Sequence, residues 1–216
     1  MFRLTPRFAR RILIPMSGVI FVTGLGFSEA AFYSGKPFDA KAAIISDLES
    51  PDDNPRGYGA SAAGTATAAI LLTPAVAVFY RRLRRVRPAP ALVGTLMFAA
   101  GLGAAISIGI LAPFTRGYSP VHIQLAYAAF IGIWGGTFFH FIAAKANQVL
   151  IALQGSVLLF LGYSYFLPEF FNNDRLLTGL AFWEWMLCLG CGIGLWILAR
   201  TVEGLEETTT VNPHSV

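Results

Sequence analysis

The stretch ALVGTLMFAAGLGAAISIGILA, residues 91–112, contains no charged side chain, and the basic run RRLRRVRP, residues 81–88, stands shortly before it. A run of about 20 apolar residues is the length that an α-helix needs to cross the hydrocarbon core of a bilayer. Lipid offers the backbone no hydrogen-bond partner, so such a run must satisfy its own peptide groups as a helix. The stretch therefore predicts a transmembrane helix that follows a basic turn.

Similar apolar stretches fill most of the chain, which is 55% hydrophobic and only 13% charged. Soluble domains carry about 25% charged residues. The sequence lacks the short alternating strands of a transmembrane β-barrel. We predict an all-α fold: a polytopic membrane protein in which residues 1–200 form one six-helix bundle and residues 201–216 a polar, disordered tail. The predicted spans are residues 12–33, 59–80, 91–112, 119–144, 147–168 and 177–199.

The basic residues predict the orientation of the bundle. If the N-terminus is inside, eleven Arg and Lys residues lie on the inner side and five on the outer side. The positive-inside rule then places both termini in the cytoplasm. These residues stand at helix ends, with no folded reading surface beside them, so the net charge of +4 does not indicate a nucleic-acid partner. The arginines before the first span could also belong to a signal peptide, but the apolar run is too long, and we expect a retained helix.

Several ionisable side chains fall within or beside the predicted spans. Such residues are costly in a bilayer and are often functional. Glu29, His122 and Glu184 stand near the outer ends of their helices, below the long acidic loop between the first two spans, whereas His140 stands near the inner face. Snorkelling, helix capping or a buried ion pair are structural explanations for each. The functional hypothesis is an outward-facing polar pocket, whose candidate residues are Asp47, His122, Ser46, Glu29, Glu184 and Arg56.

The loop over this pocket carries its own pattern. Ile44, Ile45 and Leu48 are apolar at spacings that suit a short interfacial helix with one buried face. Residues 52–55, Asp-Asp-Asn-Pro, predict an exposed turn. No other loop is long enough to return a carboxylate to the start of the fourth span. We therefore expect Asp47 to hydrogen-bond His122, directly or through one water.

The sequence offers little support for a metal or another cofactor. His122 and His140 are separated by about 27 Å of helix rise, so they cannot share one metal ion. A zinc site with a single histidine, completed by Glu29, Asp47 or Glu184, stays open, but we predict no metal and no cofactor. Cys188 and Cys191 share one helix face, and we interpret them as small packing residues.

Two segments resemble a known group of membrane proteins. They are AAIISDLESPDDNPRGYG, residues 42–59, and SPVHIQLAYAAF, residues 119–130. Ile45-Ser46-Asp47 after the first span and His122 at the start of the fourth resemble the DRAM-like superfamily. It includes autophagy modulators, lipid-remodelling factors for GPI-anchored proteins and a bacterial branch. The proline-glutamate that usually follows Ile-Ser-Asp is replaced here by Glu49-Ser50-Pro51-Asp52. The resemblance implies six spans, lipid handling and residence in a bacterial inner (plasma) membrane, but no established reaction.

Two functions from different classes fit these observations. The first is a lipid-handling protein whose partners are membrane lipids. Within it, Ser46 as nucleophile, His122 as base and Asp47 as orienting group could support acyl transfer, although we favour binding without catalysis. The alternative is a non-catalytic structural or accessory subunit of a larger membrane complex. Gly190 and Gly194 have the spacing of close helix packing, within the bundle or in a homodimer. A channel is disfavoured because the polar residues stop in the outer half.

Overall fold

The computed structural model describes residues 4–32, 45–114, 119–166 and 180–211. Within these ranges every regular element is a helix, which confirms the predicted all-α fold class. Six helices are long and apolar enough to cross a bilayer, so the chain is a multi-pass membrane protein. The first span combines α1 (Pro6–Phe8), the π-helical turn η1 (Ala9–Leu13) and α2 (Ile14–Phe32). The others are α4 (Tyr58–Leu83), α5 (Pro88–Leu111), α6 (Pro120–Ala143), α7 (Gln148–Phe166) and α8 (Leu180–Val211).

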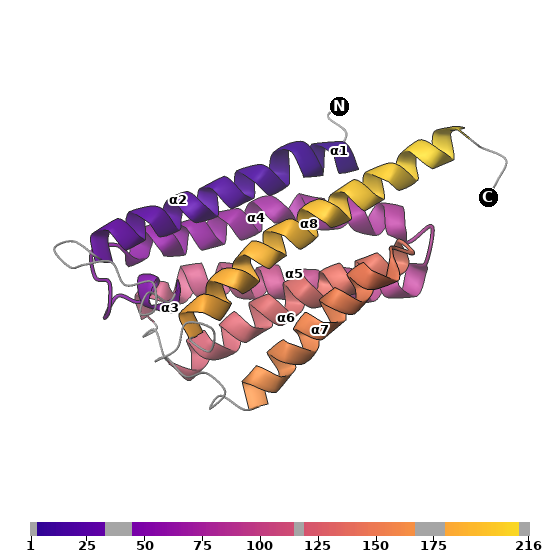
Figure 1. Ribbon diagram of the computed structural model, residues 1–216. Helices are drawn as coiled ribbons and strands as arrows, with labels where there is room; N and C mark the ends of the chain where they lie inside the picture. Colours follow the sequence, from indigo (N-terminus) through magenta and orange to yellow (C-terminus); the bar gives the residue numbers. More distant parts are fainter. Residues whose placement is uncertain (1–3, 33–44, 115–118, 167–179, 212–216) are drawn as a thin grey trace.

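Two short elements lie between the spans. The helix α3 (Ile45–Leu48) lies between α2 and α4, and the 3-10 turn η2 (Ala112–Phe114) extends α5. Figure 1 shows α3 beside the first turns of α6 and α8. We call this end of the bundle the α3 end. The first turns of the chain and the C-terminal end of α8 lie together at the opposite end.

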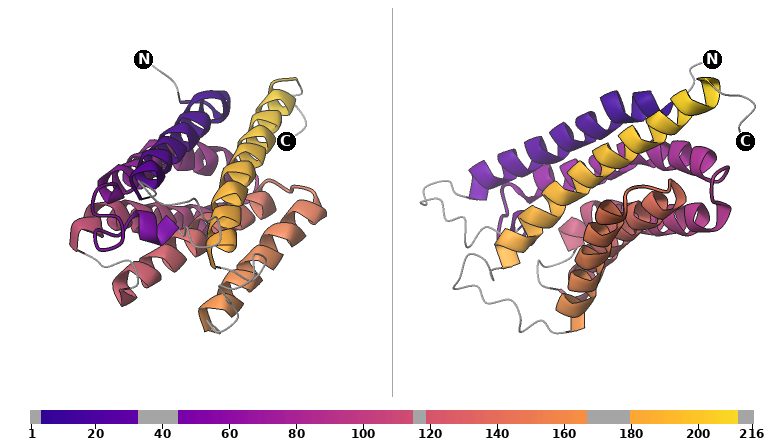
Figure 2. Two further views of the ribbon diagram at one scale, coloured as in Figure 1. Left: turned by 60° about the vertical axis from the view of Figure 1, so that its left-hand side comes forward. Right: turned by 45° about the vertical axis from the view of Figure 1, so that its right-hand side comes forward.

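The helices pack in a definite order. The most extensive contacts are those of α5 with α6, α2 with α4, and α4 with α5, while α7 packs against α6. Helix α8 runs obliquely across the bundle and touches α2, α4 and α6 over short lengths (Figures 1 and 2). The fully buried side chains of Phe79, Phe98, Phe141 and Leu198 form the middle of the main core.

Glycines allow the closest of these approaches. A methyl group on Gly101 of α5 would lie 2.7 Å from the Ile133 backbone nitrogen, and one on Gly132 of α6 would lie 2.4 Å from the Gly101 Cα. Gly190 of α8 faces the Trp134 ring, which a methyl group there would meet at 2.6 Å. The small residue at 190 therefore serves packing of α8 on α6 within one chain.

The predicted ends of the first and last spans are corrected by the structure. The first span begins at Pro6 rather than at residue 12, because Thr5 caps it and η1 buries Ala9. The last span was expected to end at residue 199 before a disordered tail, but α8 continues to Val211. Val202 is fully buried, and its neighbour Glu203 accepts an ion-paired hydrogen bond of 2.6 Å from Arg10 Nε. The polar composition after residue 200 therefore does not end the helix. Residues 212–216 lie outside the described residues.

Candidate functional site

The helix α3 is fastened to the bundle by its apolar residues. Ile45 is 8% exposed and Leu48 is fully buried, and both pack with Leu25 of α2. The Leu48 carbonyl accepts hydrogen bonds from the Ser28 hydroxyl at 2.8 Å and the Ser61 hydroxyl at 2.7 Å. The predicted short helix with a buried face is confirmed for Ile45 and Leu48, while Ile44 lies outside the described residues. The segment is thus held between α2 and α4.

The turn after α3 differs from its prediction at one residue. Asp52, Asp53 and Pro55 are exposed, as expected, but Asn54 is only 2% exposed. The Asn54 Nδ2 group donates to the Ser28 carbonyl at 2.9 Å and to the Ser28 hydroxyl at 2.7 Å, and its Oδ1 accepts from the Gly57 N–H at 3.1 Å. Asn54 is buried because its amide supplies both donors and an acceptor to polar groups where the loop meets α2.

Glu184, in the first turns of α8, binds the start of α3. Its Oε2 accepts the Ile45 N–H at 2.7 Å, and its Oε1 accepts the Ser46 hydroxyl at 2.9 Å. The first N–H groups of a helix lack partners within that helix, so a carboxylate in this position satisfies one of them. Glu184 therefore connects two segments that are far apart in the sequence.

A second carboxyl group, that of Glu49, lies at the same end. Glu49 is 5% exposed, and its Oε1 accepts a short hydrogen bond of 2.5 Å from the Thr65 hydroxyl of α4. Burial raises the pKa of Glu49 from its ordinary value of 4.5 to about 7; the Thr65 hydrogen bond opposes this rise and the Glu184 carboxyl group adds to it. In the sequence, Glu49 is one of several acidic residues of the same loop and was not predicted as a site residue. Its spacing of three residues from Ser46, which places both on one face of a helical turn, was the signal that could have identified it.

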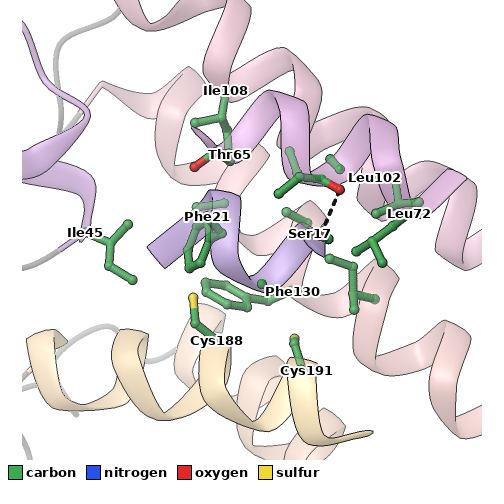
Figure 3. A pocket seen from close by; sticks show the side chains of 18 of the residues that line it. Ser17, Phe21, Ile45, Thr65, Leu72, Leu102, Ile108, Phe130, Cys188 and Cys191 are labelled. Carbon is green, nitrogen blue, oxygen red and sulfur yellow. Dashed lines mark hydrogen bonds between the residues drawn. The ribbon is translucent and has the colours of Figure 1, made fainter. Parts of the chain in front are cut away.

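These groups line one end of an internal cavity of about 190 Å³. The cavity is bounded by α2, α4, α5, α6 and α8, with α3 at one end. Figure 3 shows Phe21, Phe130 and Cys188 directed into it from three different helices. The rest of its wall is apolar apart from the Ser17 hydroxyl, which donates to the Ala68 carbonyl at 2.9 Å. The polar groups at the α3 end are Ser46, Glu49, Thr65, His122 and Glu184.

The cavity also borders the lipid-facing surface between α2 and α8. Gly18 of α2 and Gly192 of α8 both line it, and both are exposed on the outside of the bundle. A methyl group added to either glycine would meet no atom within 4 Å. At these two positions the wall of the cavity is therefore also part of the outer surface of the bundle.

Three of the six predicted site residues meet in this cavity. Ser46, His122 and Glu184 line it, whereas half-buried Asp47, half-buried Glu29 and exposed Arg56 are not part of its wall. His122 stands in the first turn of α6, which Ser119 caps by accepting the His122 N–H at 3.2 Å. The direct bond between Asp47 and His122 stays a prediction.

The histidines and cysteines do not form a metal centre in the part of the chain that the structure describes. Within it, no three His, Cys, Asp or Glu side chains are close enough together to hold an ion. His140 lies away from the cavity, stacked on Phe98 with its Nε2 3.2 Å from the Thr95 hydroxyl. Cys188 and Cys191 are free thiols on the cavity wall, so they are packing residues that also face the interior space.

No protein-family model, no curated protein and no solved structure matches this chain. The resemblance to the DRAM-like superfamily therefore stays a prediction.

Proposed function

We propose that this protein binds a lipid-like amphiphile, with the tail in the cavity and the polar head at the α3 end. The observation that supports the proposal is the distribution of polarity along the cavity wall: apolar over most of its length and carboxyl-lined at one end. An apolar cavity of about 150 Å³ in an engineered protein stays dry and binds benzene. A cavity of about 190 Å³ therefore suits part of one hydrocarbon chain better than water or a whole two-chain lipid.

The shape of the site also favours a chain. Its wall follows α8 from Glu184 to Leu195, which lie eleven positions, or about 16 Å of helix rise, apart. A hydrocarbon chain that moves from the bilayer to this path stays in apolar surroundings, loses no hydrogen bonds and gains van der Waals contacts with the cavity wall. We propose that the chain enters from the bilayer between Gly18 and Gly192, where the cavity wall is exposed on the outside of the bundle.

Binding is favoured over acyl transfer by the hydrogen bond of Ser46. The Ser46 hydroxyl donates to Glu184 rather than to a histidine, so it is not arranged as a nucleophile activated by His122. We accordingly propose a binding protein whose partners are membrane lipids. The accessory-subunit alternative is supported by α7, which presents Val149, Leu153 and Leu159 on the outside of the bundle, where either lipid or a partner helix could cover them.

We propose that both termini are cytoplasmic and that the α3 end faces outward across a bacterial inner membrane. The eleven-to-five distribution of basic residues supports this orientation, and the Arg10–Glu203 pair supports a common side for the two ends of the chain. A phosphatase reporter fused after Val216 should be inactive and a fluorescent protein fused there should be bright. Active phosphatase at that position would overturn the orientation.

The binding proposal is tested by blocking the proposed entry to the cavity. The protein is purified into nanodiscs with a mid-chain diazirine lipid probe, photolysed, and digested for mass spectrometry. We expect the label on residues 187–195 of α8 and a clear loss of it in Gly192→Leu. Gly26→Leu is the matched control, because Gly26 is also exposed with no atom near its Cβ position but does not line the cavity. Absence of label on residues 187–195 would overturn the proposal, as would equal labelling in the two variants.

A further inference from the structure

The polar end of the cavity combines hydrogen-bond acceptors with two carboxyl groups, which are negatively charged when they are ionised. Glu49 and His122 are 5% and 4% exposed, and Glu184, which is half-buried, lines the same wall. Glu184 is close enough to Glu49 to act on it electrostatically. Glu49 lies in the turn directly after α3, His122 in α6 and Glu184 in α8, so three segments together form this end of the cavity.

These groups retain unused acceptor capacity. A carboxylate has about four lone-pair sites. Within the described ranges, Glu184 uses two of them for Ile45 and Ser46, and Glu49 uses one for Thr65. No described residue hydrogen-bonds the His122 ring, although the side chain is nearly completely buried and borders the cavity. Because no described residue is its partner, this buried ring can take a hydrogen bond from a ligand or a water in the cavity.

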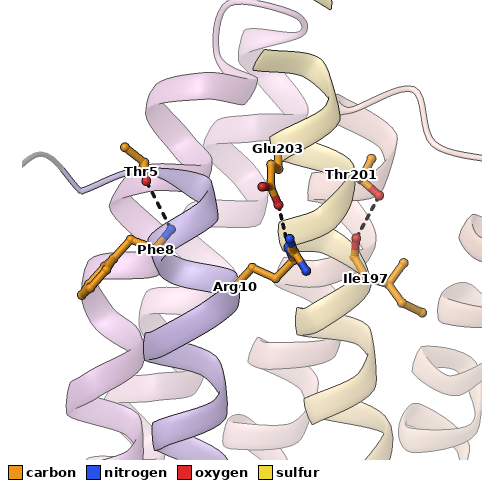
Figure 4. A network of polar contacts seen from close by, with 6 residues as sticks. All are labelled: Thr5, Phe8, Arg10, Ile197, Thr201 and Glu203. Atoms are coloured by element: carbon orange, nitrogen blue, oxygen red, sulfur yellow. Dashed lines mark hydrogen bonds and ion pairs between the residues drawn. The ribbon is translucent and has the colours of Figure 1, made fainter. Parts of the chain in front are cut away.

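The charge at this end is also uncompensated within the described ranges. Among the described residues, Arg10 and Glu203 form an ion pair (Figure 4). This pair lies at the opposite end of the bundle from the cavity carboxyl groups. Buried carboxylates without a counter-charge are costly, so a cationic ligand head would be more favourable here than a neutral or anionic one. A fatty acid would add a third carboxyl group beside Glu49 and Glu184.

A primary ammonium group supplies both hydrogen-bond donors and a positive charge. It carries one positive charge and three N–H donors, one for each of Glu49, Glu184 and His122. A hydroxyl group brings one donor and no charge, and a quaternary ammonium brings charge without a donor. We infer that the cavity binds a single-chain primary amine, with the ammonium group held by Glu49, Glu184 and His122 and the alkyl chain along α8. This inference rests on the proposed function and specifies the class of its ligand.

The test compares head groups on one tail. Photoreactive dodecyl chains with the same mid-chain diazirine and an amine, hydroxyl, carboxylate or trimethylammonium head are added to the protein in phosphatidylcholine nanodiscs. The signal is the ratio of label on residues 187–195 to label on residues 149–159 of α7, a segment that exposes Val149, Leu153 and Leu159 and does not line the cavity. This ratio corrects for unequal partitioning of the probes into the bilayer. We expect the amine ratio to exceed the other three by about tenfold or more.

Variants then assign the head group to its acceptors. Glu49→Gln combined with Glu184→Gln should reduce the amine ratio to that of the hydroxyl probe, whereas Glu203→Gln at the opposite end should preserve the preference. A competition in the wild-type protein gives the same answer without relying on the folding of a variant: unlabelled dodecylamine should displace the amine probe at lower concentration than dodecanol or dodecanoate.

The outcomes separate the two proposals. Equal ratios for all heads, each above one, would overturn the amine inference and leave amphiphile binding intact. Ratios no higher than one for every head would overturn amphiphile binding itself. An amine-bearing lysophospholipid probe is a further arm: labelling equal to that of the simple amine would assign the site to a lipid head group, and weaker labelling would assign it to a free long-chain amine.

Discussion

Ser46 donates a 2.9 Å hydrogen bond to Oε1 of Glu184, a residue 138 positions further along the chain. The neighbouring Ile45 N–H donates to the other oxygen of the same carboxyl group at 2.7 Å. One side chain of α8 thus receives two hydrogen bonds from α3. The position of α3 over the cavity therefore depends on the first turns of α8 as well as on the apolar contacts of Ile45 and Leu48.

Removing the Ser46 hydroxyl and removing the Glu184 carboxyl group should both destabilise the protein, but to different extents. Ser46→Ala should lower the free energy of unfolding by about 1 to 3 kcal/mol, because it removes one hydrogen bond to an ionisable group. Glu184→Ala should cost more, since it also leaves the Ile45 N–H without an acceptor. Denaturant unfolding of both single variants and the double variant in one detergent checks this. Strictly additive losses would contradict a direct coupling between the two side chains.

The contact between α5 and α6 predicts a large effect from a single methyl group. In Gly101→Ala the new Cβ would lie 2.7 Å from the Ile133 backbone nitrogen, so the two helices must separate, at a cost of about 1 to 3 kcal/mol or more. Gly103→Ala on the same helix is the matched control, because no atom lies within 4 Å of its Cβ position. That variant should be neutral or more stable by up to about 1 kcal/mol through helix propensity. Melting temperatures that fall equally in both variants would show that the close approach is not the cause.

The span count was predictable because hydropathy over 20 residues reports directly on bilayer crossing. The end of α8 was not, since burial of Val202 and the ion pair of Glu203 depend on where Arg10 lies in space. The candidate site could likewise be predicted only in part, because its make-up depends on how distant segments pack. Glu184 and His122 were identifiable as ionisable residues in apolar segments. Glu49 stands in a loop rich in acidic residues, and only the packing of α3 distinguishes it from its exposed neighbours.

Asn54 should be the most sensitive residue of the turn after α3. Asn54→Ala removes two hydrogen bonds to Ser28 and the acceptor of the Gly57 N–H, leaving buried polar groups unsatisfied at about 1 to 3 kcal/mol each. We expect a lower melting temperature and faster proteolysis of the segment around residue 50. Asp53→Ala, which changes an exposed side chain on the same turn, should leave both measurements unchanged. A variant at position 54 as stable as the wild type would show that this network does not hold the loop.

The carboxyl group of Glu49 predicts how stability varies with pH. Its pKa is about 7 in the folded protein, mainly because of burial, against an ordinary value of 4.5. Between these pH values the folded protein retains a proton that the unfolded chain has released. The free energy of unfolding therefore falls as pH rises from about 4.5 to about 7, and this contribution is constant above that range. At about 1.4 kcal/mol for each pH unit, the total loss is up to about 3 kcal/mol.

Substitution distinguishes Glu49 from the other groups near it. Glu184 and Cys188 of α8 act on it electrostatically, and His122 of α6 lines the same cavity. Glu49→Gln should make the decline in melting temperature between about pH 4.5 and 7 clearly smaller, because glutamine does not titrate. Glu184→Gln should leave the decline but end it at lower pH, since the neighbouring carboxyl group no longer raises the pKa of Glu49. The exposed-site variant Asp53→Asn should retain the wild-type profile. If Glu49→Gln shows the same decline as the wild type, the proton that governs stability in this range is bound elsewhere.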